Sequence, residues 1–396
     1  MLEVDAGSFL AIVAVATFAA TAAGLVAGRL ALPVVVLELV AGIVIGPQVL
    51  ELAEPDAFIE FFSSLGLGML FFFAGYEIDF ERILGVPLRL ALLGWAVSLA
   101  LAYALGGLLV ATGLVLSTLF VGTALATTAI GTLIPILSDA DELRSRFGTY
   151  LLAAGAVGEF GPIMLTTLLF STQAAGSNAL LLLAFLALAV VAAVTAVRGA
   201  GPGPGSDLFE RGLETSGQLP VRASVLAVFG LGTLAASLGL DLLLGGFVAG
   251  VITRLALKGR EVPVFESKLK AVAYGFFIPF FFVVSGLQFD LRALTDHPAS
   301  LLELPLFLAL FFVVRGAPAF LLYRRRLELR ERAALAFFSA TELPLVVAIT
   351  TIAVGEGHMR SSTAASLVGA AILSTAIFPL VALRVRAGDQ ALGSPA

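Results

Sequence analysis

The chain of 396 residues contains no cysteine, few charged residues and no long stretch of alternating polar and apolar residues. Without cysteine it forms no disulfides and has no thiol chemistry, although this absence says little about its compartment. Charged residues make up only 13% of the chain and hydrophobic residues 59%, so a water-soluble fold could not cover its surface with polar groups. The missing alternation argues against a membrane β-barrel. No paired acids, zinc-ligand histidine cluster or serine dyad points to an enzyme.

What the chain has instead is a series of long apolar runs separated by short polar segments. A helix needs roughly 20 apolar residues to cross the hydrocarbon core, and it satisfies its own backbone hydrogen bonds there. The first run lacks a basic leader and a clear cleavage site, so we expect it to remain as a span. The sequence predicts an all-α polytopic membrane protein with thirteen transmembrane helices, at residues 7–28, 33–50, 58–76, 87–112, 115–137, 147–170, 178–197, 223–238, 240–257, 271–289, 300–322, 332–354 and 362–383.

The basic residues are distributed very unevenly about these spans. Only Arg292 and Arg360 fall on one side, and Arg315 falls inside a span. The other twenty lie on the opposite side: Arg29, Arg82, Arg89, Arg144, Arg146, Arg198, Arg211, Arg222, Arg254, Lys258, Arg260, Lys268, Lys270, Arg324, Arg325, Arg326, Arg330, Arg332, Arg384 and Arg386. Cytoplasmic loops carry such an excess of Lys and Arg. We therefore expect a multi-pass protein of the bacterial or archaeal inner (cytoplasmic) membrane, with its N-terminus outside and its C-terminus in the cytoplasm.

A polar segment, residues 198–220, divides the apolar runs into two groups. It contains Gly-Ala-Gly-Pro-Gly-Pro-Gly-Ser and charges of both signs, a composition typical of a flexible linker. The predicted organisation is a first membrane half (1–197), a cytoplasmic linker (198–220), a second membrane half (221–383) and a short cytoplasmic tail (384–396).

The two halves resemble each other at three places in the same order. The matched segments are 39–44 with 247–252, 72–79 with 283–290, and 126–128 with 340–342. Each pair lies seven spans apart, and because seven is odd the repeats are inverted. Two inverted repeats, spans 2–6 and 9–13, are the architecture of secondary transporters.

Small or helix-breaking residues gather in two corresponding spans. They are Thr127, Thr128, Gly131 and Pro135 in span 5, and Thr341, Glu342 and Pro344 in span 12. Pro344 removes a backbone donor and frees the carbonyl of Ala340. Paired interruptions of this kind predict unwound backbone at the midplane, where freed carbonyls and helix ends face a substrate site. The alternative is an ordinary proline kink in each helix.

Four ionisable side chains lie well inside spans: Glu38, Glu159, Arg315 and Glu342. Each would cost roughly 2.5–3.5 kcal/mol at the bilayer centre, so each is a candidate for function. Glu159 is the strongest because it lies midway along span 6, between Gly158 and Gly161, which allow another backbone to approach. We expect it to hold either a proton or a small cation, and a purely structural acid is the alternative. Gly158 is also an expected helix break, as are Gly131, Pro135 and Pro344, and Pro162 is expected to loosen the hydrogen-bond ladder.

Arg315 stays protonated at any accessible pH and therefore cannot carry a proton. We expect a fixed positive charge that neutralises Glu342 or Glu38 and helps hold the crossed helices, or else a purely structural pair. Glu38 could equally serve packing on the dimer side. The single tryptophan, Trp95, is expected to face lipid or to pack.

These segments together resemble a known family. The segments are 32–47, 65–79, 238–250 and 279–287, which resemble the Kef-like branch of the monovalent cation/proton antiporter superfamily (sodium/hydrogen exchanger family). The resemblance runs from about residue 30 to 383. It implies a homodimer in which spans 5 and 12 cross, and in which a carboxylate on span 6 exchanges protons for sodium or potassium in an elevator-like motion.

Three departures from the family pattern affect the interpretation. Family members usually carry an Asp pair, Asn-Asp or Gln-Asp on span 6, whereas this chain has Gly158-Glu159 and so a single acid. The span 11 position that is often Lys is Arg315, while Glu342 matches the span 12 glutamate. The nucleotide-binding domain of many Kef proteins does not follow span 13, so gating by that domain is not expected.

The sequence therefore predicts an antiporter, not an enzyme, that exchanges Na⁺ or K⁺ for H⁺. The ion would bind a dehydrated site of oxygens from Glu159, Thr127, Thr128 and freed carbonyls, and a single acid predicts electroneutral, one-for-one exchange. The alternative is a channel-like potassium efflux protein, gated by a separate soluble subunit, in which Glu159 tunes a pore. Expected partners are monovalent cations, protons, membrane lipid and a second copy; no cofactor and no nucleic acid are expected.

Overall fold

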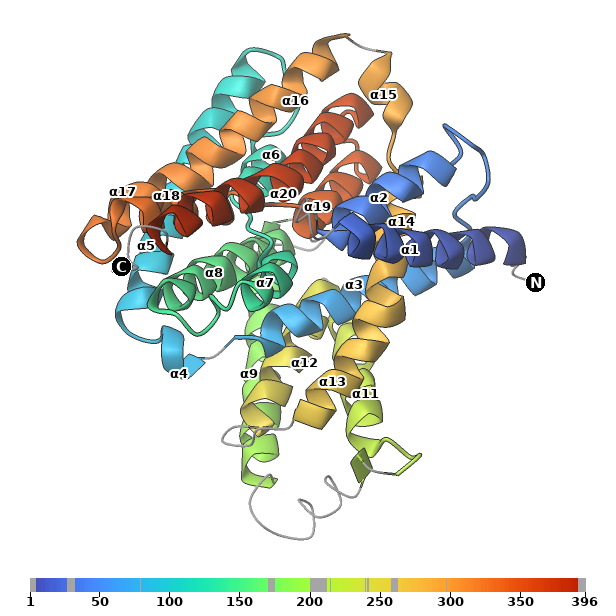
Figure 1. Cartoon of the computed structure of the whole chain (residues 1–396), viewed down its shortest axis with the longest axis vertical. Coiled ribbons are helices and arrows are strands. Elements are labelled where there is room, and N and C mark those ends of the chain that lie inside the picture. The colour runs from blue at the N-terminus through green and yellow to red at the C-terminus, as the bar shows by residue number, and fades with distance from the viewer. Residues whose placement is uncertain are drawn as a thin grey trace. The chain divides into compact units, whose positions relative to one another are not determined.

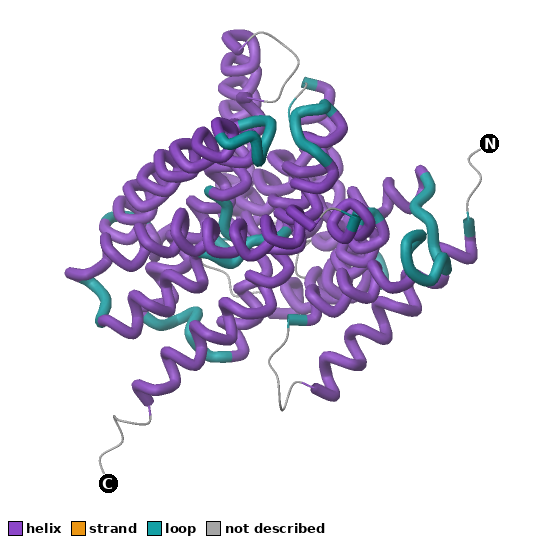
Figure 2. The backbone as a smooth tube through the Cα atoms, turned by 90° about the horizontal axis from the view of Figure 1, so that it is seen from above, coloured by secondary structure: helices purple, strands orange, loops and turns teal. Residues whose placement is uncertain are grey.

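The computed structural model describes residues 5–26, 33–78, 80–169, 175–199, 212–213, 215–238, 240, 242–257, 263–296 and 298–390. Within these ranges every regular element is a helix (Figure 1, Figure 2). The helices are α1 (Ala6–Val26), α2 (Val34–Ile45), α3 (Ala57–Tyr76), α4 (Phe80–Ile83), α5 (Val86–Ala111), α6 (Thr118–Leu125), α7 (Ile130–Asp139), α8 (Arg146–Leu169), α9 (Ala175–Gly199), α11 (Leu219–Ser237), α12 (Leu242–Ala256), α13 (Pro263–Val272), η1 (Ala273–Phe277), α14 (Ile278–Leu287), α15 (Leu291–Thr295), α16 (Pro298–Phe311), η2 (Phe312–Gly316), α17 (Ala317–Leu322), η3 (Tyr323–Arg325), α18 (Leu329–Ser339), α19 (Pro344–Gly355) and α20 (Ser361–Gln390).

Eight stretches within the described residues are long and apolar enough to cross a membrane. They are Ala6–Leu25, Ala57–Tyr76, Val86–Ala111, Leu219–Ser237, Pro263–Leu287, Ser300–Arg325, Leu329–Gly355 and Ser361–Arg386. The protein is thus an all-helical, polytopic membrane protein, and the count of thirteen spans stays a prediction. Most of the expected linker (200–211 and 214) and the end of the expected tail (391–396) lie outside the described residues. The first residues of that tail continue α20 to Gln390.

The chain forms two compact units, and each takes segments from both halves of the sequence. Unit 1 comprises Met1–Phe9, Pro55–Asp79 and Ile163–Val284, and unit 2 comprises Leu10–Glu54, Phe80–Pro162 and Ser285–Ala396. The predicted linker therefore separates the two halves of the sequence, but it does not separate the two compact units.

A direct backbone contact between two helices occurs in unit 1, where α3 meets α12. A Cβ atom added to Gly75 would overlap the carbonyl oxygen of Phe247, and one added to Gly250 would overlap that of Phe72. Only glycine permits so close an approach. This contact joins a helix of the first half to a helix of the second half.

Unit 2 contains the corresponding contact between α14 and α2. A Cβ atom at Gly286 would overlap the carbonyl oxygen of Leu39 and would lie 2.9 Å from the Cα of Gly42. In the matched sequence segments, Gly42 corresponds to Gly250 and Gly75 corresponds to Gly286. The same pair of positions is therefore in contact once in each unit.

Unit 2 also contains two interrupted helices. α6 ends at Leu125 and α7 begins at Ile130, while α18 ends at Ser339 and α19 begins at Pro344. Each interruption has four residues, 126–129 and 340–343, and they fall in the predicted spans 5 and 12. The expected break positions need correction, because only Pro344 borders an interruption.

Three of the residues expected to break helices lie inside helices. Gly131 and Pro135 fall within α7, and Gly158 falls within α8. An interior proline removes one donor and its ring crowds the carbonyl four residues earlier, but α7 nevertheless continues past Pro135. Glycine merely lowers helix propensity. The first interruption lies instead upstream of these residues, at Thr127 and Thr128.

Candidate functional site

The two interruptions in unit 2 are joined by hydrogen bonds. The backbone N–H of Ala129 donates to the carbonyl of Thr341 (2.8 Å). The hydroxyl of Thr128 donates to the carbonyl of Ser339 (2.5 Å). Backbone groups that have no helical partner must be satisfied inside a membrane protein, and here each interruption supplies partners for the other.

Helix α8 anchors the first interruption through a freed carbonyl. The N–H of Thr128 donates to the carbonyl of Gly158 (3.0 Å). Pro162 occupies the position four residues later, where it has no N–H to donate, so the Gly158 carbonyl lacks its helical partner. A Cβ atom at Gly158 would overlap the Nη2 atom of Arg315 and would lie 2.8 Å from the Thr128 hydroxyl. Gly158 is thus a position of close approach.

Glu159, the next residue of α8, is 1% exposed. The backbone N–H groups of Ile130 and Gly131, the first two residues of α7, lie close enough to its carboxyl group to favour a negative charge there. The N-terminus of a helix favours a negative charge because its free N–H groups point outward. The Oε2 atom of Glu159 has no hydrogen-bond partner. The site therefore contains a buried carboxyl group with one unpartnered oxygen, which is able to take a proton or bind a cation.

Arg315, on the π-helical turn η2 of unit 2, is 4% exposed. Its Nε atom donates to the carbonyl of Thr127 (3.0 Å) and to the hydroxyl of Thr128 (2.9 Å). Its Nη1 atom donates to the hydroxyl of Ser98 (3.2 Å), and its Nη2 atom donates to the carbonyl of Ala154 (3.3 Å). One side chain thus connects α5, α8 and the first interruption.

The expected partner of Arg315 is reached indirectly. Among the described residues, Arg315 forms no direct ion pair with Glu342 or Glu38. Thr127 lies between the charges, because its carbonyl accepts from Arg315 while its hydroxyl donates to Oε2 of Glu342 (2.8 Å). Arg315 and Glu342 still interact electrostatically. Glu38 is buried on α2, and no hydrogen bond or ion pair links it to this cluster in the described part of the chain.

Glu342 is fully buried in the second interruption and is held by helix α20. Its N–H donates to the hydroxyl of Ser374 (3.0 Å), and its carbonyl accepts from Ser374 and Thr375 (both 3.0 Å). Its Oε1 atom has no partner. Sequence reasoning missed Ser374 and Thr375, since two hydroxyl residues in an apolar helix form no distinctive pattern.

Trp95 on α5 also supports the first interruption. Its indole N–H donates to the carbonyl of Ala126 (3.1 Å), and its ring lies where a Cβ atom at Gly161 would come within 2.6 Å of it. The expectation that Trp95 packs holds, and the hydrogen bond to the interruption is an addition. A lone tryptophan in an apolar helix gave no signal for that bond.

The site thus combines a buried carboxyl group with two interrupted helices that are joined by hydrogen bonds. The family described as "Sodium/hydrogen exchanger, transmembrane" matches residues 13–383. The chain belongs to the sodium/hydrogen exchanger family. The resemblance noted in its sequence is confirmed at this level.

Individual relatives of this chain show how far the similarity extends. YjbQ of Bacillus subtilis, provisionally named an Na⁺/H⁺ antiporter, is 26% identical in an alignment that covers 89% of this chain and 59% of YjbQ. KefC of Cronobacter sakazakii, named a glutathione-regulated potassium-efflux system protein, is 30% identical in an alignment that covers 70% of this chain and 45% of KefC. The chain thus spans about half the length of these two relatives. The solved structure of the sodium proton antiporter MjNhaP1 from Methanocaldococcus jannaschii has 17% identity, covers 96% of both chains and has a TM-score of 0.62, a likeness of fold.

Proposed function

We propose that this exchanger is a secondary antiporter that exchanges a monovalent cation, Na⁺ or K⁺, for H⁺, with Glu159 as the shared site. The observation that carries the proposal is the buried carboxyl group of Glu159, which has one unpartnered oxygen and lies at the N-terminus of α7. Membership of the family and the names of its relatives support the same activity. Their names describe transporters, and the proposal involves no enzymatic reaction.

The charges around the site support one-for-one exchange. Three ionisable side chains are buried there, namely Glu159, Glu342 and Arg315. Arg315 and Glu342 compensate each other through Thr127, which leaves Glu159 as the one charge to be balanced. A bare carboxylate is costly to move through a low-dielectric barrier, whereas a carboxylate discharged by one proton or one cation is not. Only the loaded site then crosses, and the exchange is electroneutral.

Further ligands for the cation would come from the first interruption. Thr127 and Thr128 bring carbonyl and hydroxyl oxygens close to the α7 N-terminus, and a carbonyl that accepts one hydrogen bond retains a second lone pair. Both Na⁺ and K⁺ accept such oxygen ligands, and the size of the site selects between them.

The matched contacts of the two halves support the architecture proposed for transport. The glycine contacts at Gly75–Gly250 and Gly42–Gly286 recur at corresponding positions, and the two interruptions lie 214 residues apart, as the sequence repeat does. We infer inverted repeats of spans 2–6 and 9–13, thirteen spans in all, with an elevator-type motion of one unit in a homodimer. We place the protein in the inner membrane with its N-terminus outside, on the distribution of basic residues.

The test is cation-dependent proton exchange in reconstituted vesicles, measured with a pH-sensitive dye against a panel of monovalent cations. The Glu159→Gln variant should fold and lose exchange, because an amide can neither take the proton nor discharge a cation. The matched control is Glu303→Gln, which alters another buried glutamate, on α16, and should keep exchange. A folded Glu159→Gln protein that still exchanges would remove Glu159 from the mechanism. A transport current that reverses according to the number of charges moved would contradict electroneutrality.

The similarity to KefC favours one alternative, a channel-like potassium efflux protein gated by a separate soluble subunit. The same vesicles distinguish the two functions. An antiporter gives saturable cation flux with a matching return of protons, whereas a pore gives cation flux without that return.

A further inference from the structure

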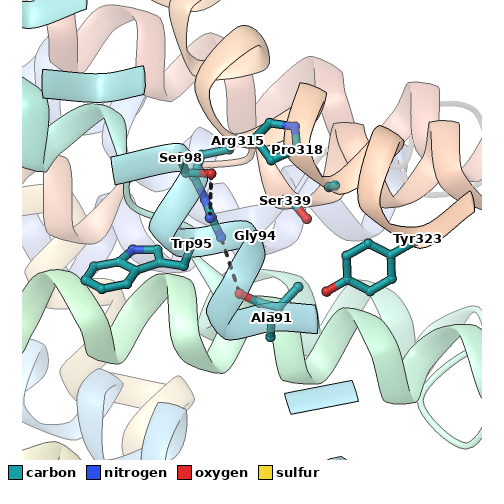
Figure 3. A pocket seen from close by; sticks show the side chains of 10 residues that line it. Ala91, Gly94, Trp95, Ser98, Arg315, Pro318, Tyr323 and Ser339 are labelled. Carbon is teal, nitrogen blue, oxygen red and sulfur yellow. Dashed lines mark hydrogen bonds between the residues drawn. The ribbon is translucent and has the colours of Figure 1, made fainter. Parts of the chain in front are cut away.

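A small polar pocket in unit 2 is not used by the proposed exchange. It lies between α5, α8, α18 and the segment from η2 to η3, and its interior has about the room that one water molecule needs. Four polar side chains line it: Ser98, Arg315, Tyr323 and Ser339. Figure 3 shows these side chains around the pocket, with Arg315 bonded to Ser98.

Two of the lining hydroxyl groups are buried without a partner. The Oη atom of Tyr323 and the Oγ atom of Ser339 have no hydrogen bond, although each residue is only 1% exposed. Buried polar groups in native proteins are nearly always hydrogen-bonded, through protein or through ordered water. Both hydroxyls belong to the same pocket, so a single bound molecule could satisfy the two.

Arg315 contributes unused donors to the same pocket. A guanidinium group has five N–H bonds. The Nε–H serves Thr127 and Thr128, one Nη1–H serves Ser98, and one Nη2–H serves Ala154. One N–H on each terminal nitrogen is therefore left over. The pocket thus offers donors from Arg315 and groups that both donate and accept from Tyr323 and Ser339.

We propose that this pocket is a binding site for one structural water molecule. The water accepts a hydrogen bond from Arg315 and bonds the hydroxyls of Tyr323 and Ser339, giving it three partners, the usual number for a buried water. A small anion fits less well, because Glu342 already compensates the charge of Arg315 and a further negative charge would be buried nearby.

Through the water, Arg315 is linked by hydrogen bonds to two further elements, η3 and α18. Tyr323 is on η3 and Ser339 is the last residue of α18, directly before the second interruption. Arg315 already holds the first interruption, so the water connects the two interrupted helices through the guanidinium group. The inference does not depend on which cation is transported.

A double-mutant cycle on the full-length protein tests the proposal by thermal melts in detergent. Tyr323→Phe and Ser339→Ala should each lower the apparent Tm, because each removes a ligand of the bound water. The two losses should be non-additive, since the second substitution acts on a water that the first has already released. Tyr103→Phe, which removes a direct bond to Thr123 (3.0 Å), is the matched control and should be additive with Ser339→Ala.

Three outcomes would overturn the proposal. In a dry pocket, removing an unpartnered hydroxyl leaves the Tm unchanged or raises it. Additive losses would show that Tyr323 and Ser339 share no ligand. Replacing chloride by gluconate should not change the Tm; a fall in the unmutated protein that is absent in Ser339→Ala would identify an anion instead. A cryo-EM map that resolves ordered water should show density within hydrogen-bond distance of both hydroxyls.

Discussion

The close packing at Gly158 makes a quantitative prediction for Gly158→Ala. The added methyl group would overlap Arg315 Nη2 and lie 2.8 Å from the hydroxyl of Thr128, and both groups are already held by hydrogen bonds. Forcing a methyl group into such a site costs about 1–3 kcal/mol. The better helix propensity of alanine recovers at most ~1 kcal/mol. We expect a net loss of about 1–2 kcal/mol, seen as a lower apparent Tm.

The same substitution should weaken cation binding, because Arg315 and Thr128 must move away from α8. The measurement is the KM for Na⁺ or K⁺ in the vesicle assay, beside thermal melts of the purified protein. Gly230→Ala is the control: it lies inside α11, and an added Cβ there has no atom within 4 Å. It should leave the KM nearly unchanged and raise the Tm slightly, because alanine favours a helix interior over glycine by up to ~1 kcal/mol. If Gly158→Ala melts and transports like Gly230→Ala, the packing described around Arg315 is wrong.

Three further substitutions test other contacts. Thr127→Val keeps the shape of the side chain but leaves both carboxyl oxygens of Glu342 without a partner, so melts should show a loss of about 1–3 kcal/mol; an unchanged Tm would refute the bridge. Trp95→Phe removes the indole bond to the first interruption and should raise the cation KM more than it lowers kcat, and an unaltered KM would count against this positioning role. Glu142→Gln weakens the partly buried ion pair with Arg386 and should make the Tm less sensitive to salt, which melts at low and high ionic strength would show or contradict.

The membrane fold and the position of the acid could be predicted from the sequence because both depend on local composition. Apolar runs and the placement of basic residues indicate spans whatever the helices pack against. Glu159 could be recognised as a candidate because a carboxylate midway along an apolar span is costly, so such residues are kept mainly where they have a function. Membership of the exchanger family followed from motifs along most of the chain and is confirmed.

The exact place of the first interruption could not be predicted, because tertiary contacts decide it. Gly131 and Pro135 look like breakers, yet α7 continues through both. The chain leaves the helix after Leu125, and the carbonyls of Gly158 and Thr341 accept hydrogen bonds from the N–H groups of Thr128 and Ala129. Tertiary packing likewise decides the composition of the two units, since helices pair across the halves at glycine contacts that chain order does not reveal.

The π-helical turn η2 makes the position of Arg315 sensitive to the loss of a single residue from this turn. A π-helix accommodates one residue more per turn than an α-helix, so deleting a residue such as Val313 would restore ordinary winding. The helices on either side would keep their register, because the π-helical turn absorbs the extra residue, but the residues within the turn, Arg315 among them, would change direction about the axis. The guanidinium group would turn away from its four acceptors while the helix itself stayed intact. A protein that lacks one residue in this turn would therefore keep the arginine in its sequence but lose the hydrogen bonds that the arginine makes here.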